Sequence, residues 1–360
     1  MCYAAITSLW MTVFASPAVL AQTAEQIDAV VLDEMARQNI VGMAVGIVKN
    51  GNIYYASGYG HADLERRVPV TTNTIFHWSS ISKTLTATAA LKLAEENPGF
   101  SLNDRVTEHV SYWPEHGNRG NIRIRHLLSN RSGIIHYTQR KNCYQNPSPR
   151  YARSKHTSKY YNAKQAVEVF SNQKLCFDPG TGYKYSTFGF SLLGSAIEGG
   201  SGTSYTNWIR DRIKRPLGMY SLQQATGTRM GFIQEDHILK TVYSGNSAWK
   251  LPGGGWESSI LDLAKFANAL LQGKLLNDTG RLWTTVPGNL TYGYGINHAF
   301  NNSRVWHEGK NDNSRSLLYL FPGSVDRLGI VLMINSVHSK PMRIAHRLVD
   351  LFVHRHGAGY

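Results

Sequence analysis

The sequence predicts an α/β (α+β) protein in which an antiparallel sheet is flanked by terminal helices and a second part is mostly helical. Strand-like patterns occur near both ends of the chain, whereas the pattern between them is mainly helical. The 360 residues are too many for one small core. We therefore expect residues 22–83 and 250–360 to form the α/β part and residues 84–249 the mostly helical part, with a site in the crevice between them.

The individual elements follow from periodicity and turn signals. Apolar residues recur at helical spacing in residues 24–39, which predicts a helix with one apolar face. Asn50-Gly51 lies between two strand-like runs and is a strong signal for a two-residue hairpin turn. Towards the C-terminus, "SLLYLFPG" and "LGIVLMINSV" predict strands, and "PMRIAHRLVDLFVH" predicts an amphipathic helix.

The first 21 residues predict a cleaved export signal. The stretch "MCYAAITSLWMTVFASPAVLAQ" has no charged side chain and contains the small-residue pattern Val19-Leu20-Ala21, so we expect cleavage after Ala21. No later stretch of the sequence is long and apolar enough to cross a bilayer. We therefore expect a secreted or periplasmic protein without a transmembrane segment.

Cleavage would leave two of the three cysteines, Cys143 and Cys176. Two cysteines in an exported protein suggest one disulfide. Their polar, loop-like surroundings favour this bridge over two unrelated buried thiols. The bridge would close a long loop, which stabilises a fold by roughly 4 kcal/mol in the chain-entropy model.

Positive charge is concentrated in one segment of a chain whose net charge is +14. Residues 140–164 carry seven Lys or Arg and no Asp or Glu, with tyrosines interleaved. Basic residues mixed with aromatic ones can bind nucleic acid, but the prolines, serines and asparagines here are typical of a solvated surface insertion. We expect such a loop first, contact with an anionic envelope polymer or substrate second, and no nucleic-acid partner.

The stretch "FHWSSISKTL" contains the strongest candidate for a nucleophile. Ser80 and Lys83 are three residues apart at the start of a helix-like segment, so both would project from one helical face. A serine hydroxyl attacks poorly until a neighbour takes its proton, and a lysine whose pKa is lowered by its surroundings can do this. Backbone N–H groups at a helix N-terminus would also favour developing negative charge on Ser80. An isolated S-x-x-K pair is more often a capping serine with a solvated lysine, so the assignment depends on further motifs.

Two further stretches carry candidate groups. In "YKYSTFG", Tyr185 could shuttle protons beside Lys83 if a positive neighbour lowered its pKa, and the alternative is a half-buried tyrosine with a local partner. In "WHEGKNDN", His307 and Gly309 lie on the way into a strand, where the glycine would let a substrate approach the backbone. This is not a zinc motif, because Asn311 stands where a second histidine is required. The sequence shows no metal-ligand cluster.

Together with "HLLSNRSGI" and "GGGWESSILDLAKFA", these stretches resemble the serine β-lactamase and penicillin-binding protein superfamily, in its class C β-lactamase, DD-peptidase and esterase branch. The resemblance runs from about Gly42 to Ser336. "SGIIHYTQ" and "YSTFGFSLLG" are particularly similar to the mitochondrial serine β-lactamase-like branch and its bacterial relatives. The resemblance implies a β-lactamase/transpeptidase-like fold and acyl-enzyme chemistry that needs no cofactor.

The resemblance also implies the roles of individual residues. It places the acyl-forming serine at Ser80, its lysine at Lys83 and the catalytic tyrosine at Tyr185. The backbone N–H groups of Ser80 and Lys310 would form the oxyanion hole. His307 would orient the substrate or assist Tyr185.

Two positions depart from the pattern of this superfamily. Thr187, a predicted substrate-binding residue with Gly309, stands where many members carry Asn, and a hydroxyl lacks the paired donor and acceptor of an amide. His307 replaces the lysine expected of β-lactamases and can be neutral at pH 7. Both departures count against efficient β-lactam hydrolysis, but neither counts against acyl-serine chemistry.

The leading hypothesis is an exported serine hydrolase that cleaves an amide or ester of a small-molecule or peptide substrate, such as a cell-wall fragment, with weak or no β-lactamase activity. The alternatives are a β-lactamase proper, a penicillin- or peptidoglycan-binding pseudoenzyme or sensor, and a polyanion-binding protein. Intact Ser80, Lys83 and Tyr185 argue against a pseudoenzyme. The sequence leaves open the substrate, the oligomeric state, and whether Lys83 or Tyr185 is the general base.

Overall fold

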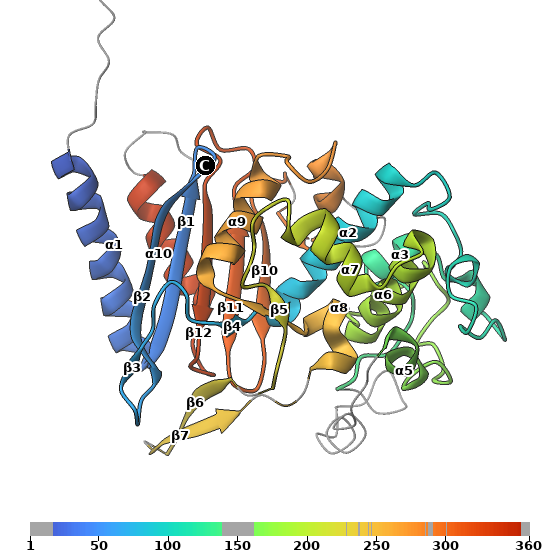
Figure 1. Cartoon of the computed structure of the whole chain (residues 1–360), viewed down its shortest axis with the longest axis horizontal. Helices are drawn as coiled ribbons and strands as arrows, with labels where there is room; N and C mark the ends of the chain where they lie inside the picture. Colours follow the sequence, from blue (N-terminus) through green and yellow to red (C-terminus); the bar gives the residue numbers. More distant parts are fainter. Residues whose placement is uncertain are drawn as a thin grey trace, which may run out of the picture.

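The computed structural model describes residues 17–353, with the exception of residues 139–161, 228, 237, 244, 246, 285, 287–290 and 300. A twisted sheet with helices on both of its faces lies beside a group of helices (Figure 1). This arrangement is the α/β fold with a flanked antiparallel sheet that the sequence predicts.

A seven-stranded sheet joins the two ends of the chain. In spatial order its strands are β3 (Val68–Pro69), β2 (Asn52–Asp63), β1 (Gly42–Lys49), β12 (Gly329–Ile334), β11 (Arg315–Leu320), β10 (Val305–Lys310) and β9 (Asn297–His298). All neighbouring pairs are antiparallel. The pairing of β1 with β12 confirms that strands from the two ends of the chain share one sheet.

The predicted hairpin turn connects β1 to β2. Asn50 and Gly51 have φ angles of 51° and 77°. Two central residues with positive φ match the right-handed twist of the flanking strands, which is why Asn-Gly is favoured in such turns. Lys49 pairs with Asn52 across the turn.

Helices cover both faces of this sheet. On one face lie α1 (Pro17–Gln38) and α10 (Pro341–Val353), which pack on each other (Figure 1). The apolar side of α1 buries Ile27, Val31 and Met35 against the sheet, which confirms the one-faced helix. The opposite face is covered by α9 (Ile260–Leu271), which packs on β1, β2 and β12.

The group of helices beside the sheet contains α2 (Ser82–Glu96), α3 (Ile124–Leu128), α5 (Ala163–Glu168), α6 (Thr187–Ser201), α7 (Tyr205–Ile209) and α8 (Leu251–Gly254). The π-helical turn Arg210–Lys214 continues α7, and short 3-10 helices occur at Ser79–Ile81 (η1), Val106–Glu108, Arg119–Asn121, Ala248–Lys250 and Thr279–Trp283. Helices α2 and α6 are buried over most of their length and pack directly on each other. The division of the chain into two domains stays a prediction.

Several strands lie outside the large sheet. The hairpin of β6 (Met230–Glu235) and β7 (Ile238–Tyr243) lies within the stretch expected to be mostly helical. A second small sheet pairs β8 (Trp256–Ser258) with β4 (Phe76–His77) on one side and with β5 (Gln223–Gln224) on the other. This small sheet matters for the site, because β4 leads directly into the Ser80 segment.

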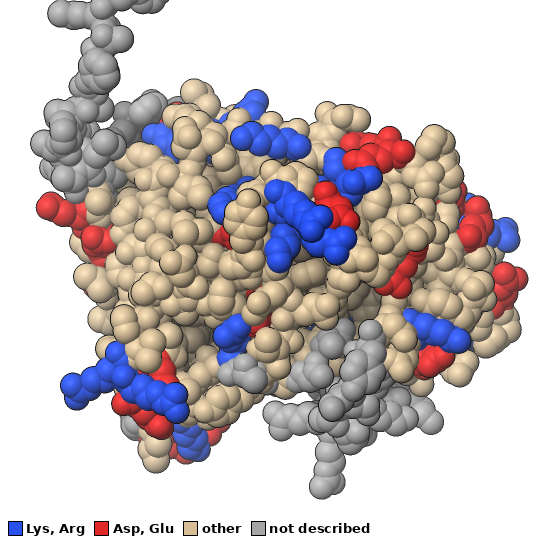
Figure 2. All heavy atoms as spheres, in the orientation of Figure 1, with Lys and Arg blue, Asp and Glu red and all other residues tan. Residues whose placement is uncertain are grey.

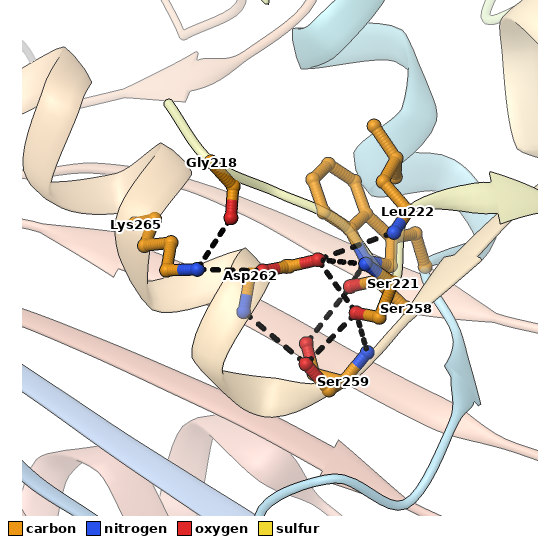
Figure 3. A network of polar contacts seen from close by, with 8 residues as sticks. Gly218, Ser221, Leu222, Ser258, Ser259, Asp262 and Lys265 are labelled. Carbon is orange, nitrogen blue, oxygen red and sulfur yellow. Dashed lines mark hydrogen bonds and ion pairs between the residues drawn. The ribbon is translucent and has the colours of Figure 1, made fainter. Parts of the chain in front are cut away.

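A buried polar network fixes the start of α9 against this small sheet (Figure 3). The carboxylate of Asp262 accepts hydrogen bonds from the backbone N–H of Ser221 at 2.7 Å and from its hydroxyl at 2.6 Å. Ser259 caps the helix by accepting from the N–H of Asp262 at 3.4 Å. The neighbouring Ser258 accepts from the indole of Trp78 at 2.7 Å. The network therefore holds the residue that precedes the Ser79–Ser80 pair.

The structure does not test three predictions, which concern the disulfide, the basic segment and export. Cys143 lies outside the described residues, so its bridge to Cys176 stays a prediction. Most of the basic segment 140–164 also lies outside. Within the described residues no helix has the length and apolar character needed to span a membrane. Export and cleavage after Ala21 stay predictions.

The surface shown in Figure 2 carries basic and acidic side chains in small mixed groups on a largely uncharged background. Some basic and acidic side chains of the protein form ion pairs, since Arg212 pairs with Glu96 and Arg215 pairs with Asp211. A mixed surface of this kind gives no support on this face to the polyanion-binding alternative, which requires an extended basic surface.

Candidate active site

Ser80 lies in the turn that begins the central helix α2. It occupies the middle of η1, and α2 follows at Ser82. The preceding Ser79 has a φ of 48°, a left-handed conformation that is strained for a residue with a side chain. Such strain occurs where the surrounding structure holds a reactive residue in position. The strain thus lies next to the predicted nucleophile, at a helix N-terminus.

Lys83 lies directly beneath the Ser80 hydroxyl. Its Nζ is 3.2 Å from Ser80 Oγ, 3.1 Å from Thr187 Oγ1 and 2.5 Å from the carbonyl oxygen of Gly253. The side chain is fully buried. The predicted i, i+3 pairing of Ser80 and Lys83 on one helical face is therefore present in the structure.

The surroundings of Lys83 favour its neutral form. Burial lowers the pKa of Lys83 well below its ordinary value, and the positive charge of Lys250 lowers it further. No Asp or Glu of the described residues pairs with it. A neutral amine can donate to Thr187 Oγ1 and Gly253 O while its lone pair accepts the Ser80 proton, so Lys83 has the properties of a general base.

Tyr185 lies beside this pair but is not a tyrosinate. It precedes α6, and its ring lies under Lys83, with 4.7 Å from Nζ to the ring centroid. Burial raises the pKa of Tyr185 above its ordinary value, while a side-chain hydrogen bond with Ser80 acts in the opposite direction. The condition stated for a proton-shuttling Tyr185, a pKa lowered by a positive neighbour, is not met, because desolvation of the phenolate is the largest effect on this pKa. Tyr185 is thus suited to donate a proton, not to act as the resting base.

Thr187, the first residue of α6, is shared between two groups. Its Oγ1 lies 3.1 Å from Lys83 Nζ and 3.2 Å from His136 Nε2. The backbone N–H of Thr138 donates to His136 Nδ1 at 3.2 Å, so the ring proton of neutral His136 is on Nε2 and points to Thr187. Burial and the nearby lysines lower the pKa of His136 to about 3. The Thr187 hydroxyl accepts both bonds, which leaves its own proton for another partner.

His307 is buried on β10 and is neutral. Its Nδ1–H donates to the Glu308 carbonyl at 2.8 Å, so Nε2 is free to accept from the hydroxyl of Tyr292 at 3.4 Å. Burial lowers the pKa of His307 to about 3. This confirms the expectation that the position does not supply a fixed positive charge. His307 and Tyr185 are neighbours, with ring centroids 6.3 Å apart.

Gly309 has a packing role that the sequence did not reveal. A side-chain Cβ at this position would lie 1.9 Å from Ser316 Oγ and 2.4 Å from the carbonyl oxygen of Trp78. The glycine therefore lets β10 approach the Ser79–Ser80 segment, whereas we expected it to admit substrate. Lys310 follows at the exposed end of β10 and pairs with Arg315. The oxyanion-hole role of the Ser80 and Lys310 N–H groups stays a prediction.

Lys250 is a second cation near the nucleophile. A Cβ on Gly254 would be 3.6 Å from Lys250 Cδ and 3.8 Å from the carbonyl oxygen of Ser79, so the lysine stem lies beside the Ser79–Ser80 segment. Its ammonium lies near the rings of Tyr137 and Trp249, at 5.3 and 5.6 Å from their centroids. It forms no ion pair with a described residue. Its positive charge contributes to the lowered pKa of Lys83.

Sequence reasoning missed four contributors to the site. They are His136, Lys250, Gly253 and Tyr292. Gly253 bonds to Lys83, and the charge of Lys250 acts on it. His136 bonds to Thr187, and Tyr292 bonds to His307. His136 lies in "SGIIHYTQ" and Gly253 begins the glycine trio, so both stretches were noted without a role. Nothing local in the sequence distinguishes Tyr292 or Lys250. The described residues hold no group of three or more His, Cys, Asp or Glu side chains that could bind a metal ion.

The arrangement is that of a serine hydrolase: a serine at a helix N-terminus, a buried neutral lysine and a protonated tyrosine beside them. The chain belongs to the beta-lactamase family, whose model matches residues 27–354. This confirms the superfamily and the fold implied by the sequence motifs.

Similar proteins include a curated human relative and solved structures. The serine beta-lactamase-like protein LACTB, mitochondrial, of Homo sapiens is 28% identical over 295 residues, which cover 64% of this chain and 53% of that protein. The chain thus spans about half the length of this relative. The octameric penicillin-binding protein homologue from Pyrococcus abyssi superimposes with a TM-score of 0.76 at 26% identity, over 92% of this chain and 77% of that one. The D-amino acid amidase from Ochrobactrum anthropi SV3 does so with a TM-score of 0.74 at 20% identity, over 93% and 99%.

Proposed function

We propose that this protein is an exported serine hydrolase that cleaves an amide or ester through an acyl-enzyme formed on Ser80. The observation that carries the proposal is the position of Lys83, whose Nζ lies 3.2 Å from Ser80 Oγ. This lysine is buried and has no acidic partner among the described residues. A structural lysine gains nothing from such a position, because burying an unpaired cation is costly. A lysine that is neutral in the resting protein avoids this cost and is ready to accept a proton.

The reaction begins with attack of Ser80 Oγ on the substrate carbonyl while Lys83 Nζ takes the hydroxyl proton. The negative oxygen of the tetrahedral intermediate lies against the backbone N–H groups of Ser80 and Lys310. Tyr185 relays a proton to the leaving amine or alcohol, a role that suits its raised pKa. This proton is the one that Lys83 took from Ser80, so Lys83 is neutral again in the acyl-enzyme. Water then attacks the ester on Ser80, Lys83 takes a proton from the water and returns it to Ser80 Oγ, and the acid is released.

Small esters and D-amino peptide amides are the proposed substrates. The amidase among the structural neighbours has this fold, which supports amide chemistry at such a site but does not define the substrate here. Penicillins and cephalosporins should react slowly. The position of the usual lysine is held by neutral His307, and Thr187 uses its oxygen on Lys83 and His136. Losing two hydrogen bonds to charged groups, at about 1.5–3 kcal/mol each, lowers acylation by about 150-fold or more.

The test compares kcat/KM for a nitrophenyl ester, a D-alanyl dipeptide and a cephalosporin on one preparation. We expect the ester or the dipeptide to be the best substrate. A cephalosporin that is best by a wide margin would identify a β-lactamase proper instead. Stable acylation by penicillin without turnover of any of the three would identify the penicillin-binding sensor. Thr187→Asn, which restores the amide, should shift the preference towards the cephalosporin.

A further inference from the structure

A second cavity, separate from the Ser80 site, is lined by arginines. Its volume is about 740 Å³, within the range of small-molecule sites. It lies between α3, the turn that follows it and the segment 179–181, and we call it the arginine pocket. Its lining includes Arg123, Arg125, His126, Arg131, Gly180 and Tyr294.

The three guanidinium groups of the arginine pocket are held by uncharged oxygens. Arg123 donates to the backbone carbonyl of Asn103, and Arg125 donates to the side-chain oxygen of the same asparagine. Arg131 donates to the carbonyl of Gly180. None of the described lining residues is Asp or Glu. These acceptors orient the arginines without neutralising their charge, so the pocket carries net positive charge.

His126 adds a directed donor to these charges. The backbone N–H of Arg123 donates to His126 Nδ1 at 3.2 Å, which places the ring proton on Nε2. Nε2 faces Gly180, where an added Cβ would lie 3.2 Å from it, at the wall of the pocket. Burial, together with the charges of Arg125, Arg123 and Arg131, lowers the pKa of His126 to about 4. All three arginines line the same pocket as His126.

We propose that the arginine pocket binds the carboxylate or phosphate group of a small molecule. Planar guanidinium groups bind both oxyanions through paired N–H donors. Three of them in one pocket, whose described lining has no Asp or Glu, favour an anionic ligand. The site is distinct from the Ser80 centre, because Ser80, Lys83 and Tyr185 are not among its lining residues. The turn at Ser129–Arg131 connects the two, since Asn130 Oδ1 accepts from the N–H of Ser186, next to Tyr185, at 2.9 Å.

The experiment is calorimetric titration of the purified chain with inorganic phosphate, pyrophosphate and citrate, at an ionic strength held constant with chloride. The test variant is the double substitution Arg123→Gln and Arg125→Gln. The control is Arg66→Gln with Arg67→Gln, which removes the same charge from the turn between β2 and β3, outside the pocket. Circular dichroism and the melting temperature of each variant show whether it is folded.

We expect one molecule of at least one oxyanion to bind per chain, and affinity to fall by roughly 10- to 100-fold in the test variant but not in the control. Preference for phosphate and pyrophosphate over citrate would identify a phosphate ester as the ligand, and the reverse order a carboxylate. Absence of saturable binding by any of the three in the millimolar range would overturn the proposal. Equal binding by the test variant and the wild type would overturn it as well. If the double variant does not fold, Arg125→Gln alone replaces it, since Arg125 is exposed. A fall in its affinity would then support the proposal, and unchanged binding would overturn it.

Discussion

Replacing Thr187 with valine tests how the structure holds the base in place. The Thr187 hydroxyl accepts from Lys83 Nζ at 3.1 Å and from His136 Nε2 at 3.2 Å. Valine keeps the branched shape, so the packing against Gly253 is preserved, but both donors lose their acceptor. Lys83 is fully buried, so bulk solvent does not reach its amine to replace the lost hydroxyl.

The expected effect follows from the cost of an unmet hydrogen bond in a buried site. Leaving a buried donor without its partner costs about 1–3 kcal/mol. If the misalignment of Lys83 raises the activation free energy of acylation by the same amount, acylation slows by about 5- to 150-fold. Thr187→Ser keeps the oxygen and should retain the rate within a fewfold. The two variants differ by the presence of one hydroxyl at this position, so the comparison isolates that group.

The assay is the second-order rate of labelling of Ser80 by a fluorophosphonate, followed by intact-mass spectrometry. Unfolding in urea, measured on the same samples, shows whether each variant is folded under the assay conditions. A valine variant that is folded and labels as fast as the serine variant would refute the proposed role of Thr187. In that case Gly253 alone would suffice to position Lys83.

Three further predictions follow from the same structure. Lys250→Met removes a positive charge near Lys83, so the pKa of Lys83 rises and the acidic limb of the pH–acylation profile moves to higher pH. The control Lys250→Arg keeps the charge and should leave this limb in place. An unchanged limb in the methionine variant would refute the coupling between the two lysines. His307 has a folded pKa of about 3 against an ordinary value of about 6.5, so the folded state binds fewer protons and stability is lost as pH falls between these values, by about 2 kcal/mol at pH 5. The loss should be smaller in His307→Gln when urea unfolding is compared at pH 7 and 5, and an equal loss would contradict it. Cys143 and Cys176 should form one disulfide in protein from an oxidising compartment, seen as a gain of two protons upon reduction; two alkylated thiols in unreduced protein would reject this.

The large sheet was accessible from sequence because its signals are local and strong. The Asn50-Gly51 turn and the continuous apolar runs of β1 and β12 are each contained within a few residues. The hairpin of β6 and β7 was missed because most of its residues are exposed or half-buried, so the sequence shows no regular alternation. Alternation of apolar and polar residues arises where one face of a strand is buried, so a largely exposed strand gives little such signal.

The site was predictable only as far as its residues are close in sequence. The Ser80–Lys83 pair follows from helical spacing. Gly253 reaches Lys83 across 170 residues and His136 reaches Thr187 across 51, so only the folded chain brings them together. The direction of the Tyr185 pKa shift could not be read from sequence for a related reason. Burial decides it, and burial depends on packing from several elements.

Labelling of Ser80 tests the central claim most directly. The wild-type chain is treated with a fluorophosphonate beside Ser80→Ala and Lys83→Met, and adducts are located by intact-mass and peptide spectrometry. We expect one adduct on the peptide that contains Ser80, none on Ser80→Ala, and a loss of several orders of magnitude in labelling rate for folded Lys83→Met. An adduct that persists on Ser80→Ala, or a folded wild-type chain that takes no label, would contradict the assignment of Ser80 as the nucleophile activated by Lys83.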